Sequence, residues 1–152
     1  MGGEVEHLLL ALAAGIEIHI GDDDLITQRF GFRHHAAIRV HNHRTANQAR
    51  TILNPAPATQ LNRSVLQLCD VIMPNQHEVA LLGGATSLLE AGVSIVVITL
   101  GARGIKIVTK DGELQIPPFA VRALDTTGAG DAACGALATA LAHGTDITTA
   151  AR

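Results

Sequence analysis

The spacing of hydrophobic residues along the chain changes near residue 50. Residues 29–50 show neither the two-residue period of a strand nor the 3.6-residue period of a helix, so no element is predicted there. From residue 51 onward, short apolar runs alternate with segments whose apolar residues recur every three or four positions. We therefore divide the chain into residues 1–50, a poorly specified segment, and residues 51–152, a folded part.

Five segments of the folded part carry the pattern of β-strands. The run at 93–100 is apolar, continuous and mostly β-branched, which is typical of a strand buried on both faces of a sheet. Two alternating runs flank Asp111-Gly112, a dipeptide that predicts a tight β-hairpin. The predicted strands are residues 51–54, 69–73, 93–100, 104–110 and 112–117.

Helical spacing appears between these strands and after them. Leu61, Val65 and Leu68 recur at helical intervals, and glycines mark the expected ends of further apolar segments. The predicted helices are residues 60–68, 76–83, 86–92 and an alanine-rich segment that stops at Gly144. Strands that alternate with helices predict an α/β fold in which a mostly parallel sheet is flanked by helices.

Composition disfavours several classes of protein. The apolar fraction of 47% is that of a globular protein, and the formal net charge of −3 offers no basic surface for nucleic acid. Two cysteines are too few for a disulfide framework. Residues 7–16 form an apolar run that is too short to span a bilayer and lacks the basic leader of a signal peptide. We therefore expect a cytoplasmic protein with neither membrane nor nucleic-acid partners.

Histidines are concentrated in the first part of the chain. Histidine-rich tracts can bind metal. Here the spacing matches no helical ligand pattern, and no Cys or Glu lies within residues 29–50. Solvated polypeptide is therefore favoured over a metal site. The histidines before residue 50 are His7, His19, His34, His35, His41 and His43.

Candidate chemistry gathers in three loops that follow predicted strands, at residues 73–78, 99–104 and 125–131. In an open α/β sheet, ligands bind at the carboxyl ends of the strands, where loops lead into helix N-termini. None of the three loops fits the GxGxxG dinucleotide fingerprint or the GxxxxGK[ST] P-loop. This disfavours both a dehydrogenase-like binding module and a P-loop protein.

The sequence DTTGAGD at residues 125–131 has the chemistry of an anion site. Glycine tolerates positive φ and lets a ligand approach the backbone closely. Free N–H groups at a helix N-terminus, with the helix dipole behind them, attract a phosphate. Asp131 then lies in the first turn, where it can accept a proton from an attacking hydroxyl. Ordinary turn and cap chemistry is the alternative, because Thr and Asp are good helix caps.

Four motifs resemble, in the same order, the C-terminal half of the ribokinase-like carbohydrate kinases. They are ILNPAPA, MPNQHEVALLGG, VVITLGARG and LDTTGAGDAACGALATAL, and the resemblance covers about residues 51–152. It implies a ribokinase-like layered fold and transfer of the γ-phosphate of ATP to a sugar hydroxyl. Ribose is the favoured acceptor, because NPAPA is more similar to ribokinases than to fructokinases or adenosine kinases. ATP, Mg²⁺ and K⁺ are the implied cofactors, and ATP and a small sugar the implied partners.

The resemblance also implies roles for individual residues. Gly128, Ala129 and Gly130 match the anion hole for the transferring phosphoryl group. Asp131 matches the catalytic base, which contacts the sugar substrate. The residues that match the ATP site are Asn75, Thr99, Leu100, Gly101, Ala102, Arg103, Gly104, Gly130 and Asp131.

Two kinds of metal ion are implied in the same way. Glu78 matches a residue that organises Mg²⁺ through water, and Asp125 and Thr127 match ligands of a monovalent cation, usually K⁺. Structural alternatives remain open: Glu78 is also a favourable first-turn helix acid, and Asp125 and Thr127 suit an ordinary turn. The glycines of residues 99–104 likewise suit a turn. We interpret Asn54 and the prolines after it as structural.

The chain also departs from the family pattern. The N-terminal sugar-binding signature and the β-sheet lid are not found, so the ribokinase-like domain is expected to be incomplete, with a homodimer only if a lid is supplied. Ala133 replaces the usual aromatic residue, and Cys134 stands where ribokinases often carry Asn. The alternative function is therefore a non-catalytic nucleotide-binding fragment, or the product of a damaged kinase gene.

Overall fold

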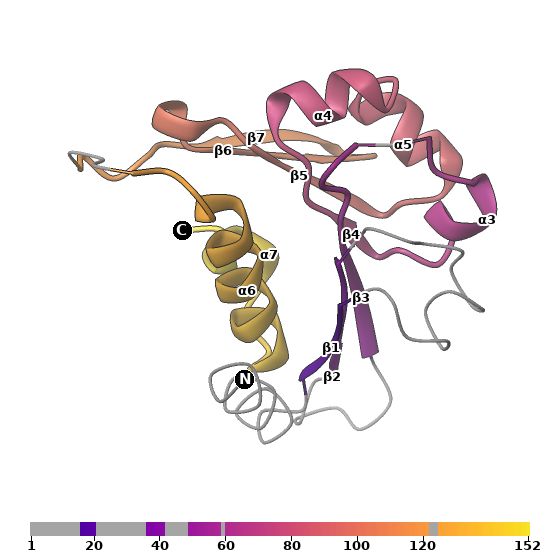
Figure 1. The fold of residues 1–152 in the computed structure, drawn as a ribbon, viewed down its shortest axis with the longest axis horizontal. Coiled ribbons are helices and arrows are strands. Elements are labelled where there is room, and N and C mark those ends of the chain that lie inside the picture. The colour runs from indigo at the N-terminus through magenta and orange to yellow at the C-terminus, as the bar shows by residue number, and fades with distance from the viewer. Residues whose placement is uncertain (1–15, 21–35, 42–48, 59, 122–124) are drawn as a thin grey trace.

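A sheet of seven strands forms the centre of the computed structural model, which describes residues 16–20, 36–41, 49–58, 60–121 and 125–152. The strands lie side by side in chain order (Figure 1). They are β1 (Ile16–Ile20), β2 (Ala36–His41), β3 (Ala49–Asn54), β4 (Val71–Ile72), β5 (Ile95–Thr99), β6 (Ile105–Thr109) and β7 (Gly112–Ile116). The pairings β3–β4 and β4–β5 are parallel, and the other four are antiparallel.

The predicted α/β fold is confirmed, but the described sheet is mixed rather than mostly parallel. Parallel neighbours need a long crossover connection, and the connections from β3 to β4 and from β4 to β5 contain helices. β5 and β6 are joined by the short 3₁₀ turn η1 (Gly101–Arg103), and β6 and β7 by a tight turn. Connections this short pair strands antiparallel, which limits the parallel part to β3, β4 and β5.

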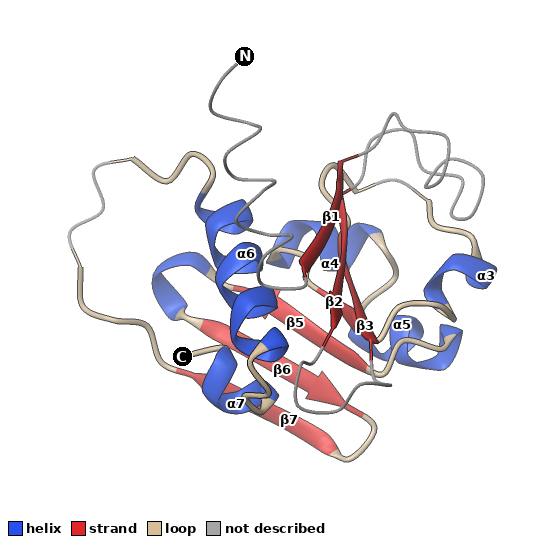
Figure 2. Cartoon of the chain, turned by 90° about the horizontal axis from the view of Figure 1, so that it is seen from below, coloured by secondary structure: helices blue, strands red, loops and turns tan. Residues whose placement is uncertain are grey.

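Helices pack on both faces of the sheet (Figures 1 and 2). α6 and α7 lie on one side, and α3, α4 and α5 lie on the other. Their bounds are α3 (Arg63–Leu66), α4 (Gln76–Leu81), α5 (Ala85–Ala91), α6 (Ala129–Ala142) and α7 (Ile147–Ala150). The predicted helices are confirmed, although α3 is shorter than its pattern suggests and α7 is not predicted. None of the helices in the described residues is long and apolar enough to cross a membrane.

Successive residues of the central strands belong to two separate hydrophobic cores, one on each face of the sheet, because side chains along a strand alternate between its faces. Ile52 and Val97 pack with residues of α6 and α7. Leu53 and Val96 pack on the opposite face with residues of α3 and α5. All four side chains are fully buried. Burial of the 93–100 strand on both faces is therefore confirmed.

β1 and β2 lie within residues 1–50, where the sequence pattern predicts no strand. They pair with each other through Ile18 and Ile38, and β2 continues the sheet by pairing its Ala36 with Asn54 of β3. Both pairings are antiparallel. The apolar run at 7–16 and most of the histidine-rich tract lie outside the described residues. The division of the chain at residue 50 stays a prediction.

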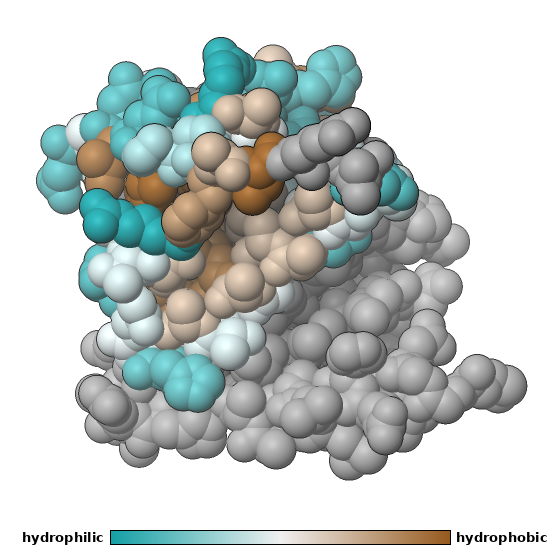
Figure 3. Space-filling view, turned by 90° about the vertical axis from the view of Figure 1, so that its left-hand side faces the viewer, coloured by the Kyte–Doolittle hydropathy of each residue, from teal (hydrophilic) through white to brown (hydrophobic). Residues whose placement is uncertain are grey.

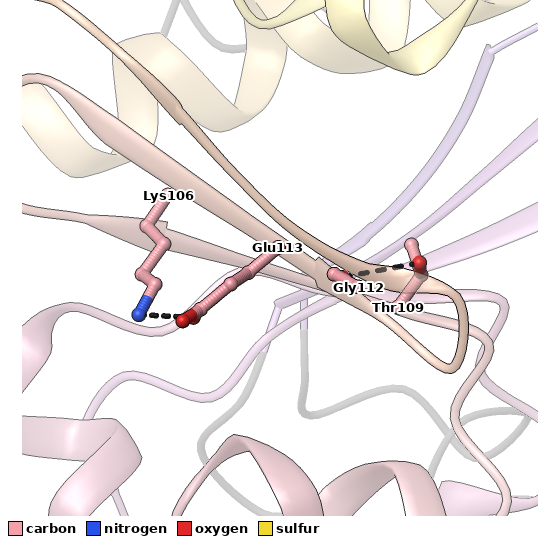
Figure 4. Close-up of polar contacts among 4 residues, drawn as sticks. All are labelled: Lys106, Thr109, Gly112 and Glu113. Carbon is pink, nitrogen blue, oxygen red and sulfur yellow. Dashed lines mark hydrogen bonds and ion pairs between the residues drawn. The ribbon is translucent and has the colours of Figure 1, made fainter.

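The hairpin predicted at Asp111-Gly112 is formed by β6 and β7 (Figure 4). Thr109 Oγ1 donates a hydrogen bond to the Gly112 carbonyl at 3.3 Å and accepts one from the Asp111 N–H at 3.2 Å. Lys106 and Glu113 form an ion pair across the two strands. Both side chains are partly exposed, so the pair adds little stability. The hairpin extends the sheet directly after the predicted 99–104 loop.

Candidate functional site

The carboxyl ends of the three parallel strands lie at one edge of the sheet. β3 ends at Asn54, the chain after β4 leads to Asn75, and β5 ends at Thr99. Asn75 and Thr99 form a parallel bridge, and the Thr99 N–H donates to the Pro74 carbonyl at 3.0 Å. Asp131 reaches the same edge, because its Oδ1 accepts a hydrogen bond from Asn54 Nδ2 at 3.0 Å. The structure thus places the three predicted loops at the same edge of the sheet.

Asn75 and Glu78 form a capping box at the start of α4. Asn75 Oδ1 accepts hydrogen bonds from the N–H groups of His77 and Glu78, both at 2.9 Å. Glu78 Oε2 accepts one from the Asn75 N–H at 2.8 Å. These bonds satisfy N–H groups that a helix start otherwise leaves without acceptors. Both side chains therefore hold the loop in place, and their roles toward ATP and Mg²⁺ stay predictions.

The 99–104 loop is a tight turn that two glycines make possible. The Leu100 N–H donates to the Gly104 carbonyl at 2.8 Å. Gly104 has a φ of +87°, and a Cβ there would lie 2.1 Å from the carbonyl oxygen of Ile116, so only glycine fits. Gly101 also has a positive φ, of +59°, but no atom lies within 4 Å of the place where its Cβ would be. The loop's backbone is therefore open to a ligand at Gly101 and closed at Gly104.

Arg103 links this loop to the start of α4. Its guanidinium donates a hydrogen bond to Gln76 Oε1, and its carbonyl accepts one from Gln115 Nε2 at 3.3 Å. Ala102 and Arg103 are both exposed. The two predicted nucleotide loops are thereby joined by a side chain as well as by the backbone bridge.

The N-terminus of α6 has no side-chain cap. Its N-cap residue is Gly128, in the left-handed conformation with a φ of +73°. A Cβ placed at Gly128 or Gly130 would meet no atom within 4 Å. The Ala129 N–H donates to the Thr126 carbonyl at 3.1 Å, which closes the turn before the helix. First-turn N–H groups have no intrahelical acceptor, so this open glycine turn is suited to hold an anion.

Asp131 is the only charged residue of α6, whose other side chains are mostly small and apolar. On the side of the molecule that carries α6 and α7, weakly to strongly hydrophobic residues form a middle band below a hydrophilic upper edge (Figure 3). Burial, and secondly the charge of Asp131, raises the pKa of the Cys134 thiol to about 11. Cys134 is therefore a neutral core group, and the role of Asp131 as a catalytic base stays a prediction.

Asp125 and Thr127 bond to each other in the turn before α6. The Thr127 N–H donates to Asp125 Oδ1 at 2.8 Å. Hydrogen bonds from the Thr127 backbone and then its side chain lower the pKa of the Asp125 carboxyl. These contacts are turn chemistry and keep the carboxylate charged. Binding of a monovalent cation by the two residues stays a prediction.

Magnesium would have few protein ligands among the described residues, where no cluster of three His, Cys, Asp or Glu side chains is found. Mg²⁺ usually keeps several waters and is held by one or two carboxylates together with substrate phosphates. The half-buried Glu78 is compatible with this mode, because the capping box engages only its Oε2.

Asn54 is the site residue that sequence reasoning missed. We interpreted it as structural, yet its amide reaches the candidate base Asp131. It is the one buried polar side chain of the described residues, with 9% of its surface exposed. A polar residue at the carboxyl end of a buried strand was a usable signal, since that is the edge where α/β proteins bind ligands.

The chain belongs to the pfkB family of carbohydrate kinases, whose family model matches residues 25–152. It is 39% identical over 108 residues to a ribokinase from Staphylococcus aureus, which covers 63% of this chain and 36% of that protein. The chain thus spans about a third of the length of this curated relative.

Solved structures show the same relationship. A ribokinase from Thermotoga maritima superposes with a TM-score of 0.61 and 36% identity, over 66% of this chain and 38% of that one. A protein from E. coli described as a ribokinase II, in complex with ATP and Mg²⁺, gives a TM-score of 0.54 and 30% identity. That match covers 58% of this chain and 31% of the other. The predicted ribokinase-like fold, present in part, is therefore confirmed.

Proposed function

We propose that this chain forms the phosphate-handling part of an ATP-dependent carbohydrate kinase, with ribose as the favoured acceptor. The observation that carries the proposal is the placement of Asp131 in the first turn of an uncapped, glycine-started helix at the ligand-binding edge of the sheet. The similar ribokinases and the ATP and Mg²⁺ complex support the choice of substrates. A cytoplasmic location, where ATP is abundant, is part of the proposal.

The transferred phosphoryl group would bind at Gly128, Ala129 and Gly130. Phosphoryl transfer has a loose transition state, so catalysis consists mainly of positioning and charge stabilisation. The N–H groups of the first helical turn and the helix dipole supply both to the phosphoryl oxygens. Because Gly128 and Gly130 leave open space, the phosphate can approach the backbone directly.

Asp131 would act as the general base. Its carboxylate takes the proton of the sugar hydroxyl while that oxygen bonds to the γ-phosphorus and the bond from phosphorus to the β–γ bridging oxygen breaks. ADP leaves with the electron pair of that bond. A sugar hydroxyl is a very weak acid, and for this reason its proton must depart as the new bond forms.

The remaining predicted residues would hold the nucleotide and its counter-ions. The nucleotide would lie along residues 99–104, beside the open backbone of Gly101. Glu78 would orient Mg²⁺ through water, which neutralises charge on the phosphates. Asp125 and Thr127 would hold a monovalent cation next to the anion hole.

Isothermal titration calorimetry with ATP and Mg²⁺ tests the proposal. Gly130→Glu places a carboxylate where the phosphate should bind, so it should abolish the binding seen with the unsubstituted chain. Gly135→Glu is the matched control, since Gly135 is in the same helix and a Cβ there also meets no atom within 4 Å. Equal binding by both variants would place the nucleotide elsewhere.

A coupled assay for ribose-dependent ADP formation distinguishes the kinase from the alternative of a non-catalytic nucleotide-binding fragment. Binding of ATP without turnover would support the fragment. Turnover with ribose above that with other pentoses would support the kinase and its favoured acceptor.

A further inference from the structure

Asn54 and Asp131 form a partly buried hydrogen bond between two elements that are far apart in sequence. Asn54 Nδ2 donates to Asp131 Oδ1 at 3.0 Å across 77 positions of the chain. Asn54 is the last residue of β3, and its side chain points to the face on which α6 packs, as does Ile52 two positions earlier. Hydrogen bonds to an ionised acceptor are shorter and stronger than neutral ones.

The donor is held rigidly. The Asn54 backbone lies inside the sheet, where Ala36 of β2 is its partner on one side and β4 pairs with the preceding Leu53 on the other. Pro55 follows directly, and its side chain is fully buried. Asn54 is therefore a fixed point from which a hydrogen bond can set the position of another group.

The acceptor, by contrast, has little to orient it within its own helix. Asp131 is exposed; of its helical neighbours, Gly128 and Gly135 have no side chains, and Cys134 is buried in the core with a neutral thiol. An exposed side chain without such neighbours exchanges freely among its rotamers. The bond from Asn54 removes this freedom.

We propose that Asn54 is a positioning residue for the base: it fixes the rotamer of Asp131, holds Oδ1, and leaves Oδ2 to accept the proton of the sugar hydroxyl. This inference rests on the proposed kinase function for its catalytic consequence, but the positioning itself does not. Among the described residues, Oδ2 receives no hydrogen bond, so it is available to the substrate. Asn54 touches the base and not the reacting atoms.

NMR on the 152-residue chain tests the positioning directly. Three-bond couplings to the Asp131 carboxyl carbon should show one χ1 rotamer in the unsubstituted chain and rotamer averaging in Asn54→Leu. Leu has the same branched arrangement of side-chain heavy atoms as Asn but no hydrogen-bonding group, so it removes the bond while the site remains filled. Asp146, an aspartate in the turn before α7, is the internal control and its couplings should not change. A single unchanged Asp131 rotamer in Asn54→Leu would overturn the inference.

An exchange of the two side chains covers the case in which Asn54→Leu fails to fold. Asn54→Asp alone removes the hydrogen-bond donor and places a second carboxylate next to that of Asp131. We therefore expect rotamer averaging at Asp131 and a lower stability of the fold. Asn54→Asp combined with Asp131→Asn restores one donor and one acceptor, and should restore a single rotamer at position 131. No recovery in the combined variant would show that the bond does not set the rotamer.

The kinetic consequence is measured separately, by ribose phosphorylation. Misplacement of a catalytic group by about 1 Å can cost on the order of 10²-fold in rate, so Asn54→Leu should lower kcat by about ten- to a hundredfold. The KM for ATP should remain nearly unchanged, because the Asn54 hydrogen bond goes to the Asp131 side chain and not to the backbone of the anion hole. Inactivity of the unsubstituted chain would count against the proposed function alone, since the NMR result still decides the positioning. An unchanged kcat would refute the catalytic consequence.

Discussion

Two helix starts at the same edge of the sheet are built in opposite ways. At α4, the side chains of Asn75 and Glu78 satisfy the backbone N–H groups through a capping box. At α6, the N-cap position is Gly128, and no side chain caps the helix. A capped start gains about 1 kcal/mol of stability, whereas the uncapped start leaves first-turn N–H groups other than that of Ala129 for a ligand. The comparison separates a helix start built for stability from one suited to phosphate.

The largest effect is expected at the uncapped start. Asp131→Asn keeps the size of the side chain but removes the basic oxygen, so turnover of ribose should fall by about 10²- to 10⁴-fold. ATP affinity should change little, because the backbone of the anion hole is intact. Steady-state kinetics and calorimetry measure the two quantities.

The control for Asp131→Asn is Asp146→Asn. Asp146 caps α7, and Asn is an equally good cap, so this variant should keep both activity and stability. Full turnover in Asp131→Asn would reject Asp131 as the base. The starts of α4 and α6 would then differ in capping but not in catalysis.

A smaller effect is expected at the capped start. Asn75→Ala removes the acceptor for two N–H groups, and should lower the free energy of unfolding by about 1 kcal/mol. Urea denaturation measures this loss. Asn75→Asp retains the cap and should keep the stability, so any ATP affinity that it loses would belong to a ligand contact. An unchanged unfolding free energy in Asn75→Ala would show that the capping box does not stabilise α4.

The smallest effect concerns pH and the turn before α6. The pKa of Asp125 is lowered from its ordinary value of 3.8 by hydrogen bonds from Thr127. Its folded pKa lies below its unfolded one, so its stabilisation is present above pH 3.8 and is lost as the pH falls through the folded pKa. Asp125→Asn should therefore reduce the loss of stability as the pH falls below 3.8. Identical pH profiles of urea denaturation for the two chains would contradict this.

Much of the fold could be predicted from the sequence because it depends on local chemistry. The Asp111-Gly112 hairpin and the helices that end at glycine are all present in the structure. The strand directions could not be predicted, since the short connections after β5 made the β5–β6 and β6–β7 pairings antiparallel. β1 was missed although Ile16–Ile20 alternates apolar and polar residues, because five residues are a weak signal without a known partner strand.

The same distinction between local and long-range interactions applies to the candidate site. The sequence by itself determined the three loops, the glycines that need positive φ and the carboxylate at the first turn of α6, because each depends on neighbouring residues. Only the tertiary structure decided that Asn54 meets Asp131, since the two are 77 positions apart and no periodicity relates them. It also decided that Asn75 and Glu78 form hydrogen bonds with each other. A side chain's type limits the bonds it can form, but its partners depend on which elements packing brings together.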